Sequence, residues 1–123
     1  MTTASLTFLL AERVMGWRYA PDRFLLGNRQ WIRLSQFQPL AEIQDAFRVL
    51  EKVATSFSLI KSGQGQFTAS VWVGDRTGCA SGKPEAATIT LAVARAIGIN
   101  APGLPEDYPP AQSWPTSDRK GQL

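Results

Sequence analysis

The amino-acid sequence predicts an α+β fold, in which a small antiparallel sheet is covered by helices, over residues 1–100. Three segments carry apolar residues at spacings of three and four, which is typical of helices that bury one face. The segments between them alternate apolar and polar residues in short runs separated by turns, which is typical of antiparallel strands. Five of the eight prolines fall in residues 101–123, so an extended Pro-rich C-terminal tail is expected there.

The N-terminal third predicts one helix followed by short strands. Residues 4–15 are predicted to form the first helix, and Gly16 is expected to end it. Its apolar stripe consists of Leu6, Leu9, Leu10 and Val14. The stretch "GWRYAPDRFLLGNRQWIRL" then predicts two or three strands, because Pro21-Asp22 and Gly27-Asn28 are turn signals between its aromatic residues.

The second helix has the clearest pattern, and it is predicted to begin at Pro39, since proline suits the first turn of a helix. Its apolar residues are Leu40, Ile43, Phe47, Leu50 and Ala54, and the residues of the other side are Glu42, Asp45, Arg48, Glu51 and Lys52. On that charged side, Asp45 and Arg48 are expected to form a surface ion pair.

The last part of the domain predicts a hairpin, a strand and a helix. "FSLIKS" and "QFTASVWV" flank Gly63-Gln64-Gly65 as the two strands of a hairpin, and "TGCASG" is a further short strand. Residues 84–97 predict a third helix that is apolar nearly all round and ends at Gly98. This helix is expected to pack against the sheet.

The residue counts exclude several classes of chemistry. The chain has no histidine and a single cysteine, Cys79, which excludes a disulfide framework, histidine-based metal sites and any imidazole base. Cys79 is expected to be a packed thiol, and the acidic residues form no pattern that would hold a metal. We therefore expect no catalytic residue, metal or cofactor. The N-terminus lacks an apolar run long enough for a signal or a membrane span, so a cytoplasmic protein is expected.

Four stretches in order carry a resemblance to a known family: "LLAERVMGW", "FQPLAEIQDAFRVLEKVA", "FTASVWV" and "ASGKPEAATITLAVARAIGI". Over about residues 6 to 99 the chain resembles the phage ABA sandwich domain, a family of small phage and prophage proteins. The resemblance implies three layers, an α/β/α sandwich, and a host-cytoplasmic location if the chain is phage-encoded. It implies no activity, so no functional residue is carried over.

The stretch "TGCASGKPEAATIT" contains the Gly-Lys step of a phosphate-binding loop, but the rest of the motif is missing. Thr77 stands where that loop needs its first glycine, and Pro84 replaces the hydroxyl that would bind magnesium. Gly82 and Lys83 therefore predict a turn from an edge strand into a helix that begins with proline. In a weaker form of the hypothesis, Lys83 supplies a positive charge at the mouth of a ligand site.

Five arginines between residues 13 and 33 face a single acid and lie among aromatic residues. Guanidinium groups bind phosphates and aromatic rings stack on bases, so this mixture is typical of a site for a nucleotide or a nucleic-acid strand. The predicted ligand-binding residues are Arg18, Tyr19, Trp31, Arg33, Arg76 and Lys83. The alternative is that tryptophans such as Trp17 complete the core while the arginines lay their stems over apolar surface.

Together these features predict a non-enzymatic phage or prophage binding protein that sequesters a small anionic ligand, such as a nucleotide signal of host antiviral defence. A homo-oligomer is expected, because small domains with exposed sheet edges tend to assemble. The alternative function is a phage accessory protein that binds nucleic acid or a protein partner. An enzyme acting on a nucleotide or sugar phosphate, with Asp75 as a base, has the weakest support.

Overall fold

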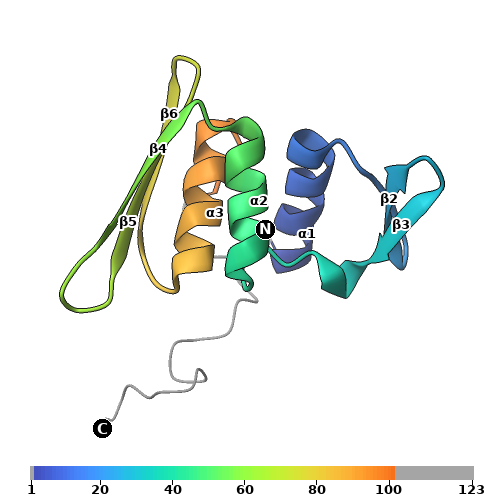
Figure 1. The fold of residues 1–123 in the computed structure, drawn as a ribbon, viewed down its shortest axis with the longest axis horizontal. Helices are drawn as coiled ribbons and strands as arrows, with labels where there is room; N and C mark the ends of the chain where they lie inside the picture. The colour runs from blue at the N-terminus through green and yellow to red at the C-terminus, as the bar shows by residue number, and fades with distance from the viewer. Residues whose placement is uncertain (1, 102–123) are drawn as a thin grey trace, which may run out of the picture.

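The computed structural model describes residues 2–101, which form three α-helices and two three-stranded antiparallel sheets (Figure 1). The helices are α1 (Thr3–Leu10), α2 (Ile43–Val53) and α3 (Glu85–Ala96), with a π-helical turn at Ala11–Met15 and a 3₁₀ turn at Leu34–Gln36. The first sheet contains β1 (Arg18–Ala20), β2 (Arg23–Gly27) and β3 (Gln30–Arg33), and the second contains β4 (Ser56–Lys61), β5 (Phe67–Val73) and β6 (Arg76–Gly82). The predicted tail lies outside the described residues except for Ala101.

The α+β class, with helices covering a small antiparallel sheet, is confirmed. Helices α2 and α3 cover one face of β4–β6, and α1 lies on the other side of α2, between it and the β1–β3 sheet (Figure 1). The layers therefore run sheet, helices, sheet, because residues 18–33 form a separate sheet instead of extending β4–β6. This arrangement leaves the outer face of each sheet away from the helices.

The second helix begins at Ile43, four residues later than predicted from Pro39. The backbone N–H groups of Ala41 and Glu42 both donate to the Gln38 carbonyl, so residues 38–42 form a turn ahead of the helix. The predicted ion pair between Asp45 and Arg48 is present, with 3.5 Å between Arg48 Nη1 and Asp45 Oδ1, but the expectation that Asp45 lies at the surface is wrong. Its side chain is buried because one carboxylate oxygen accepts a hydrogen bond from the Gln38 N–H at 2.9 Å, which fixes the turn onto the first turn of α2.

The core brings backbone and small side chains into close contact where β6 crosses α3. Gly78 of β6 is buried, and a Cβ atom at this position would overlap the backbone of Ala92 and Ala96 in α3. On the other side of the helices, the aromatic side chains of Trp17, Phe24 and Phe37 pack against one another with ring centroids 5.0–5.9 Å apart. Trp17 thus completes the core, as the alternative interpretation of the arginine-rich segment proposed.

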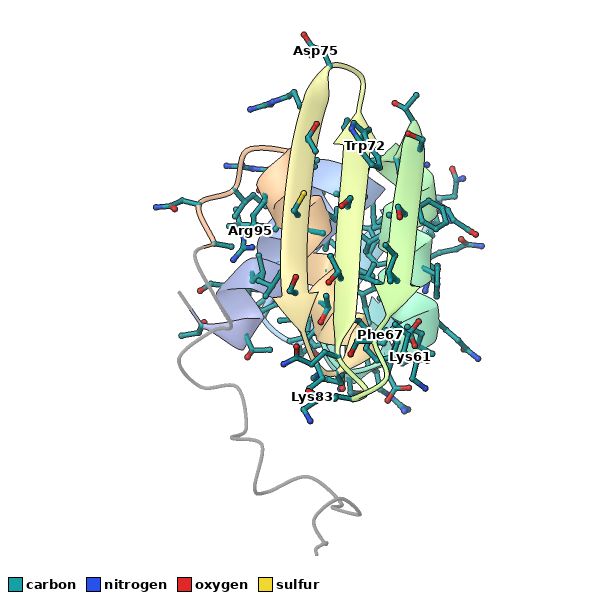
Figure 2. All side chains as sticks on the ribbon, turned by 90° about the vertical axis from the view of Figure 1, so that its left-hand side faces the viewer. Lys61, Phe67, Trp72, Asp75, Lys83 and Arg95 are labelled. Carbon is teal, nitrogen blue, oxygen red and sulfur yellow. The ribbon has the colours of Figure 1, made fainter. Side chains whose placement is uncertain are left out.

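The outer face of β4–β6 carries no charged side chain. Strand alternation and register place nine residues on this face, which we call the hydroxyl face: Ser56, Ser58, Ile60, Thr68, Ser70, Trp72, Thr77, Cys79 and Ser81. Figure 2 views the sheet from this side. Cys79 was expected to be packed, but it is exposed here, and its thiol lies 3.6 Å from the Ser70 hydroxyl.

Within residues 2–101, none of the helices has the length and apolar character needed to cross a lipid bilayer.

Candidate functional site

The β1–β3 sheet places its arginines on one face. Register pairs Arg18 with Leu25 and Leu25 with Trp31, and in the next row it pairs Arg23 with both Ala20 and Arg33. Because side chains alternate along a strand, these residues all lie on the outer side of the sheet. We call this surface the arginine face and define it by Arg18, Arg23, Leu25, Trp31 and Arg33.

The centre of the arginine face is an ordered pair of side chains. The Arg23 guanidinium carbon lies 4.3 Å from the centroid of the Trp31 ring, and the Trp31 side chain is still 49% exposed. Asp22 holds the same guanidinium through two contacts, of 2.9 Å to Nε and 3.0 Å to Nη2. The hydrogen bond from Arg23 lowers the pKa of the Asp22 carboxyl, and the same bond raises the pKa of Arg23.

Two features of this sheet are unfavourable for the isolated fold. Arg23 and Arg33 are direct cross-strand partners, and like charges in that relation destabilise a sheet. The β2–β3 turn has Asn28 at φ 53° and Arg29 at φ 64°, and the second of these positions is ordinarily filled by glycine. Arginine thus occupies two positions where a neutral residue or glycine would give a more stable hairpin. Both features place guanidinium groups on or beside the arginine face.

The structure separates the other predicted site residues from this face. Tyr19 lies on the inner side of the sheet, where its ring stacks on Phe8 of α1 with centroids 4.0 Å apart. Arg76 begins β6, in the other sheet, and its guanidinium lies against Gly98 just beyond the C-terminus of α3. Such a cation is favourable near helix carbonyls, so this contact gives Arg76 a structural role.

Lys83 also belongs to the other side of the molecule (Figure 2). It lies between the end of β6 at Gly82 and Pro84, the residue that caps α3, so the stretch that resembles a phosphate-binding loop is a strand-to-helix turn, as predicted. Of the six predicted ligand-binding residues, the structure brings together Arg18, Trp31 and Arg33.

Arg23 and Arg29 were not among the predicted ligand-binding residues, although both belong to the arginine-rich segment. The turn at Gly27-Asn28 alone does not predict this pair, because a two-residue loop that pairs Gly27 with Gln30 would place Arg23 opposite Leu34. A bulge between Leu25 and Gly27 shifts the register by one residue and puts Arg23 opposite Arg33. Within residues 2–101, no group of three or more Cys, Asp or Glu side chains is placed to hold a metal ion.

The comparisons with known proteins agree with this fold. The family model of the phage ABA sandwich domain matches residues 8–96. Among solved structures, the crystal structure of a phage protein from Bacillus cereus ATCC 14579 is similar, with a TM-score of 0.66 and 15% identity, over 79% of this chain and 88% of that chain. At this identity the likeness shows a common fold. No curated protein matches the chain.

Because the family model extends over more than half of the sequence, the chain belongs to the phage ABA sandwich domain family.

Proposed function

We propose that this protein is a non-enzymatic phage binding protein that takes up a small anionic, nucleotide-like ligand on the arginine face. The observation that carries the proposal is the juxtaposition of three guanidinium groups with an exposed indole ring on one open surface. Guanidinium groups bind phosphate oxygens in a bidentate manner, and they also stack on aromatic planes. The face thus offers the two kinds of contact that a nucleotide needs.

The arrangement assigns different tasks to the arginines. Arg23 is already bound by Asp22 and stacked on Trp31, so these two planar groups provide a stacking surface for a base. No side-chain contact joins Arg18 or Arg33 to an acidic group within residues 2–101. These two guanidinium groups are available to bind phosphate. Arg33 is also the cross-strand partner of Arg23, so an anion bound beside them would reduce the repulsion between the two positive charges.

The size of the face favours a small ligand over a long strand. The sheet has three strands, of three, five and four residues, which gives a surface about 10 Å across and about 17 Å long. A nucleic-acid strand would need a longer positive groove. We further propose that the protein sequesters this ligand, which means that it binds the ligand without converting it. The chain has no histidine and therefore no imidazole base for catalysis, which is consistent with sequestration.

A thermal-shift experiment on the purified chain tests the proposal. The panel contains mono-, di- and cyclic nucleotides, NAD-derived nucleotides and a single-stranded oligonucleotide, because any ligand that binds only the folded state raises Tm. A shift with one nucleotide that is recovered unaltered supports sequestration. A shift with oligonucleotides of any sequence, lost steeply with added salt, would replace the proposal by nucleic-acid binding. Absence of any shift would direct the search to a protein partner.

A further inference from the structure

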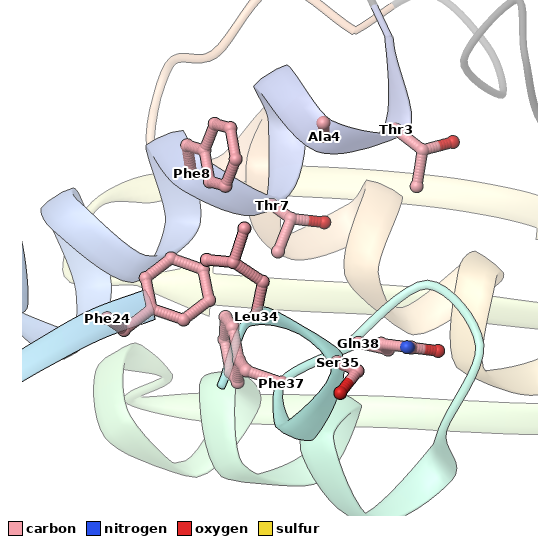
Figure 3. Close-up of a pocket in the computed structure, with 9 residues that line it drawn as sticks. All are labelled: Thr3, Ala4, Thr7, Phe8, Phe24, Leu34, Ser35, Phe37 and Gln38. Carbon is pink, nitrogen blue, oxygen red and sulfur yellow. The ribbon is translucent and has the colours of Figure 1, made fainter. Parts of the chain in front are cut away.

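A cavity that differs chemically from the arginine face lies between α1, β2 and the segment that follows β3 (Figure 3). Its volume is about 430 Å³, which is in the range of small-molecule sites. The phenyl rings of Phe8, Phe24 and Phe37 line it together with Leu34, and none of its lining residues is charged. Phe24 lies on the inner side of the β1–β3 sheet, so this cavity is separate from the arginine face.

Among residues 2–101, the buried hydroxyl of Thr7, which lines this cavity, has no hydrogen-bond partner. Thr7 is only 8% exposed, and none of the hydrogen bonds formed among residues 2–101 involves its side chain. The other buried threonines differ: Thr90 donates to the Pro39 carbonyl at 2.6 Å, and Thr88 donates to the Pro84 carbonyl at 2.9 Å. Burying an unsatisfied hydroxyl is unfavourable, so native structures rarely retain one without a reason.

The Thr7 hydroxyl is directed into the cavity. Figure 3 shows it on the side of α1 that faces Leu34 and Gln38, between the aromatic rings and the polar rim. The rings of Phe24 and Phe37 are fully buried, so a molecule bound there would contact the Phe8 ring and Leu34. It would also form one hydrogen bond with the Thr7 Oγ1 atom. A fully charged group would find no counter-ion and would have to give up its hydration.

From this cavity and its unsatisfied hydroxyl we propose a binding site for an uncharged aromatic compound with a single hydrogen-bonding group. Phenol and indole have this chemistry, since each combines an apolar ring with one O–H or N–H donor. The site is independent of the proposed nucleotide function, because the two sites share no residue.

Titration of the full chain with indole and with phenol, followed by Tm and by calorimetry, tests this site. Both compounds are expected to raise Tm. Thr7→Val removes the hydroxyl and keeps the shape, so it should weaken phenol binding roughly two- to tenfold while toluene, which cannot form the hydrogen bond, binds as before. Equal loss for phenol and toluene would overturn the role of Thr7.

A pair of variants controls for nonspecific binding. Ala4 lines the cavity and is exposed at its mouth, whereas its neighbour Ser5 is exposed and lines nothing there. Ala4→Leu should abolish the indole shift and Ser5→Leu should retain it, with both variants folded by circular dichroism. Arg33→Ala should leave the indole shift unchanged, which separates this site from the arginine face.

The alternative occupant of the cavity is an aromatic side chain of the same chain. Tyr108 and Trp114 lie outside the described residues and carry the same ring chemistry. If the full chain shows no response to indole or phenol, the proposal of a free ligand fails. A response that emerges only in the Tyr108→Ala/Trp114→Ala double variant would assign the cavity to one of these rings instead.

Discussion

Arg23 and Arg33 lie directly opposite each other on neighbouring strands, and the Arg23 guanidinium lies 4.3 Å from the Trp31 ring centroid. Stacking on Trp31 and the bond to Asp22 hold Arg23 beside a residue of the same charge. A hairpin selected for stability alone would place a neutral residue at one of these two positions. The Arg23–Arg33 pair therefore points to binding, and not stability, as the role of the arginine face.

Removing the guanidinium group of Arg18 or of Arg33 should weaken nucleotide binding. Arg18→Ala and Arg33→Ala are each expected to lower the affinity about tenfold, because each removes a charge-assisted hydrogen bond to phosphate. Calorimetry with the nucleotide found in the thermal-shift panel measures the change. Lys52→Ala removes an exposed cation on α2 and serves as the control. Unchanged affinity in both arginine variants would exclude the arginine face as the site.

The turn between β2 and β3 gives a prediction in which stability and binding change in opposite directions. Arg29 has φ 64°, a conformation that glycine adopts more easily, so Arg29→Gly should stabilise the fold by about 0.5–1 kcal/mol. Loss of its charge should also weaken nucleotide binding severalfold. Urea unfolding and calorimetry measure the two effects. A loss of stability on this change would contradict the assignment of strain to Arg29.

Asp22 places a negative charge beside the proposed phosphate site, so Asp22→Asn, which removes that charge, is expected to raise nucleotide affinity severalfold. The Arg23 hydrogen bond lowers the pKa of Asp22, so the carboxylate stays ionised to a lower pH than an unpaired aspartate would. The favourable contribution of the Asp22–Arg23 pair to stability is present above the unfolded-state pKa of Asp22 and is lost as the pH falls through the folded-state pKa.

The affinity for a phosphodiester should not change between about pH 6 and 8, since the chain has no histidine to change its charge in that range. A fall in affinity in the Asn variant would mean that Asp22 positions Arg23 for the ligand.

Close packing of β6 on α3 predicts a large effect from one methyl group. Gly78→Ala would drive a Cβ into the backbone of Ala92 and Ala96, so it should destabilise the domain by about 1–3 kcal/mol or more. Gly63→Ala is the matched control, because a Cβ at Gly63 meets no atom within 4 Å. Thermal unfolding compares the two variants. Similar Tm values for both would show that β6 can move away from α3 at little cost.

The hydroxyl face is the surface through which we predict self-association. It is uncharged, and it exposes Ile60 (61%) and Trp72 (37%), so a second copy could stack on it without burying unpaired charge. Ser70→Glu places a carboxylate at its centre and should convert an oligomer to monomers in light scattering. Gln64→Glu, in the β4–β5 turn, is the control. A wild-type chain that is monomeric at high concentration would contradict the prediction.

Apolar periodicity in the sequence was sufficient to predict α2 and β5, because a spacing of three and four residues fits a helix and strict alternation fits a strand. The third helix is apolar nearly all round, so Pro84 and Gly98 at its two ends, rather than its periodicity, predicted it. Periodicity could not show that residues 18–33 form a sheet of their own, since strand partners are chosen by tertiary contacts. The same limit explains the site. Arg18 and Tyr19 are neighbours in sequence but face opposite sides of β1, and only the register with β2 shows which side carries Trp31.

The predicted start of α2 at Pro39 was wrong because of a local hydrogen bond. Pro39 is compatible with a first helical turn, but the Gln38 N–H bonds to the Asp45 carboxylate, and this contact delays the helix to Ile43. A buried aspartate that joins two segments has the same sequence pattern as a surface aspartate. The apolar cavity beside Thr7 left no sequence signal either, because its lining residues come from three separate segments.

The two open sheet faces point away from each other, with all three helices between them (Figure 1). Copies that associate through one face would therefore leave the other accessible, and the binding capacity of an assembly would grow in proportion to the number of its chains. For a small ligand that contacts one chain at a time, the affinity of each arginine face would stay that of the single chain, and the amount of ligand held would follow the total concentration of chains.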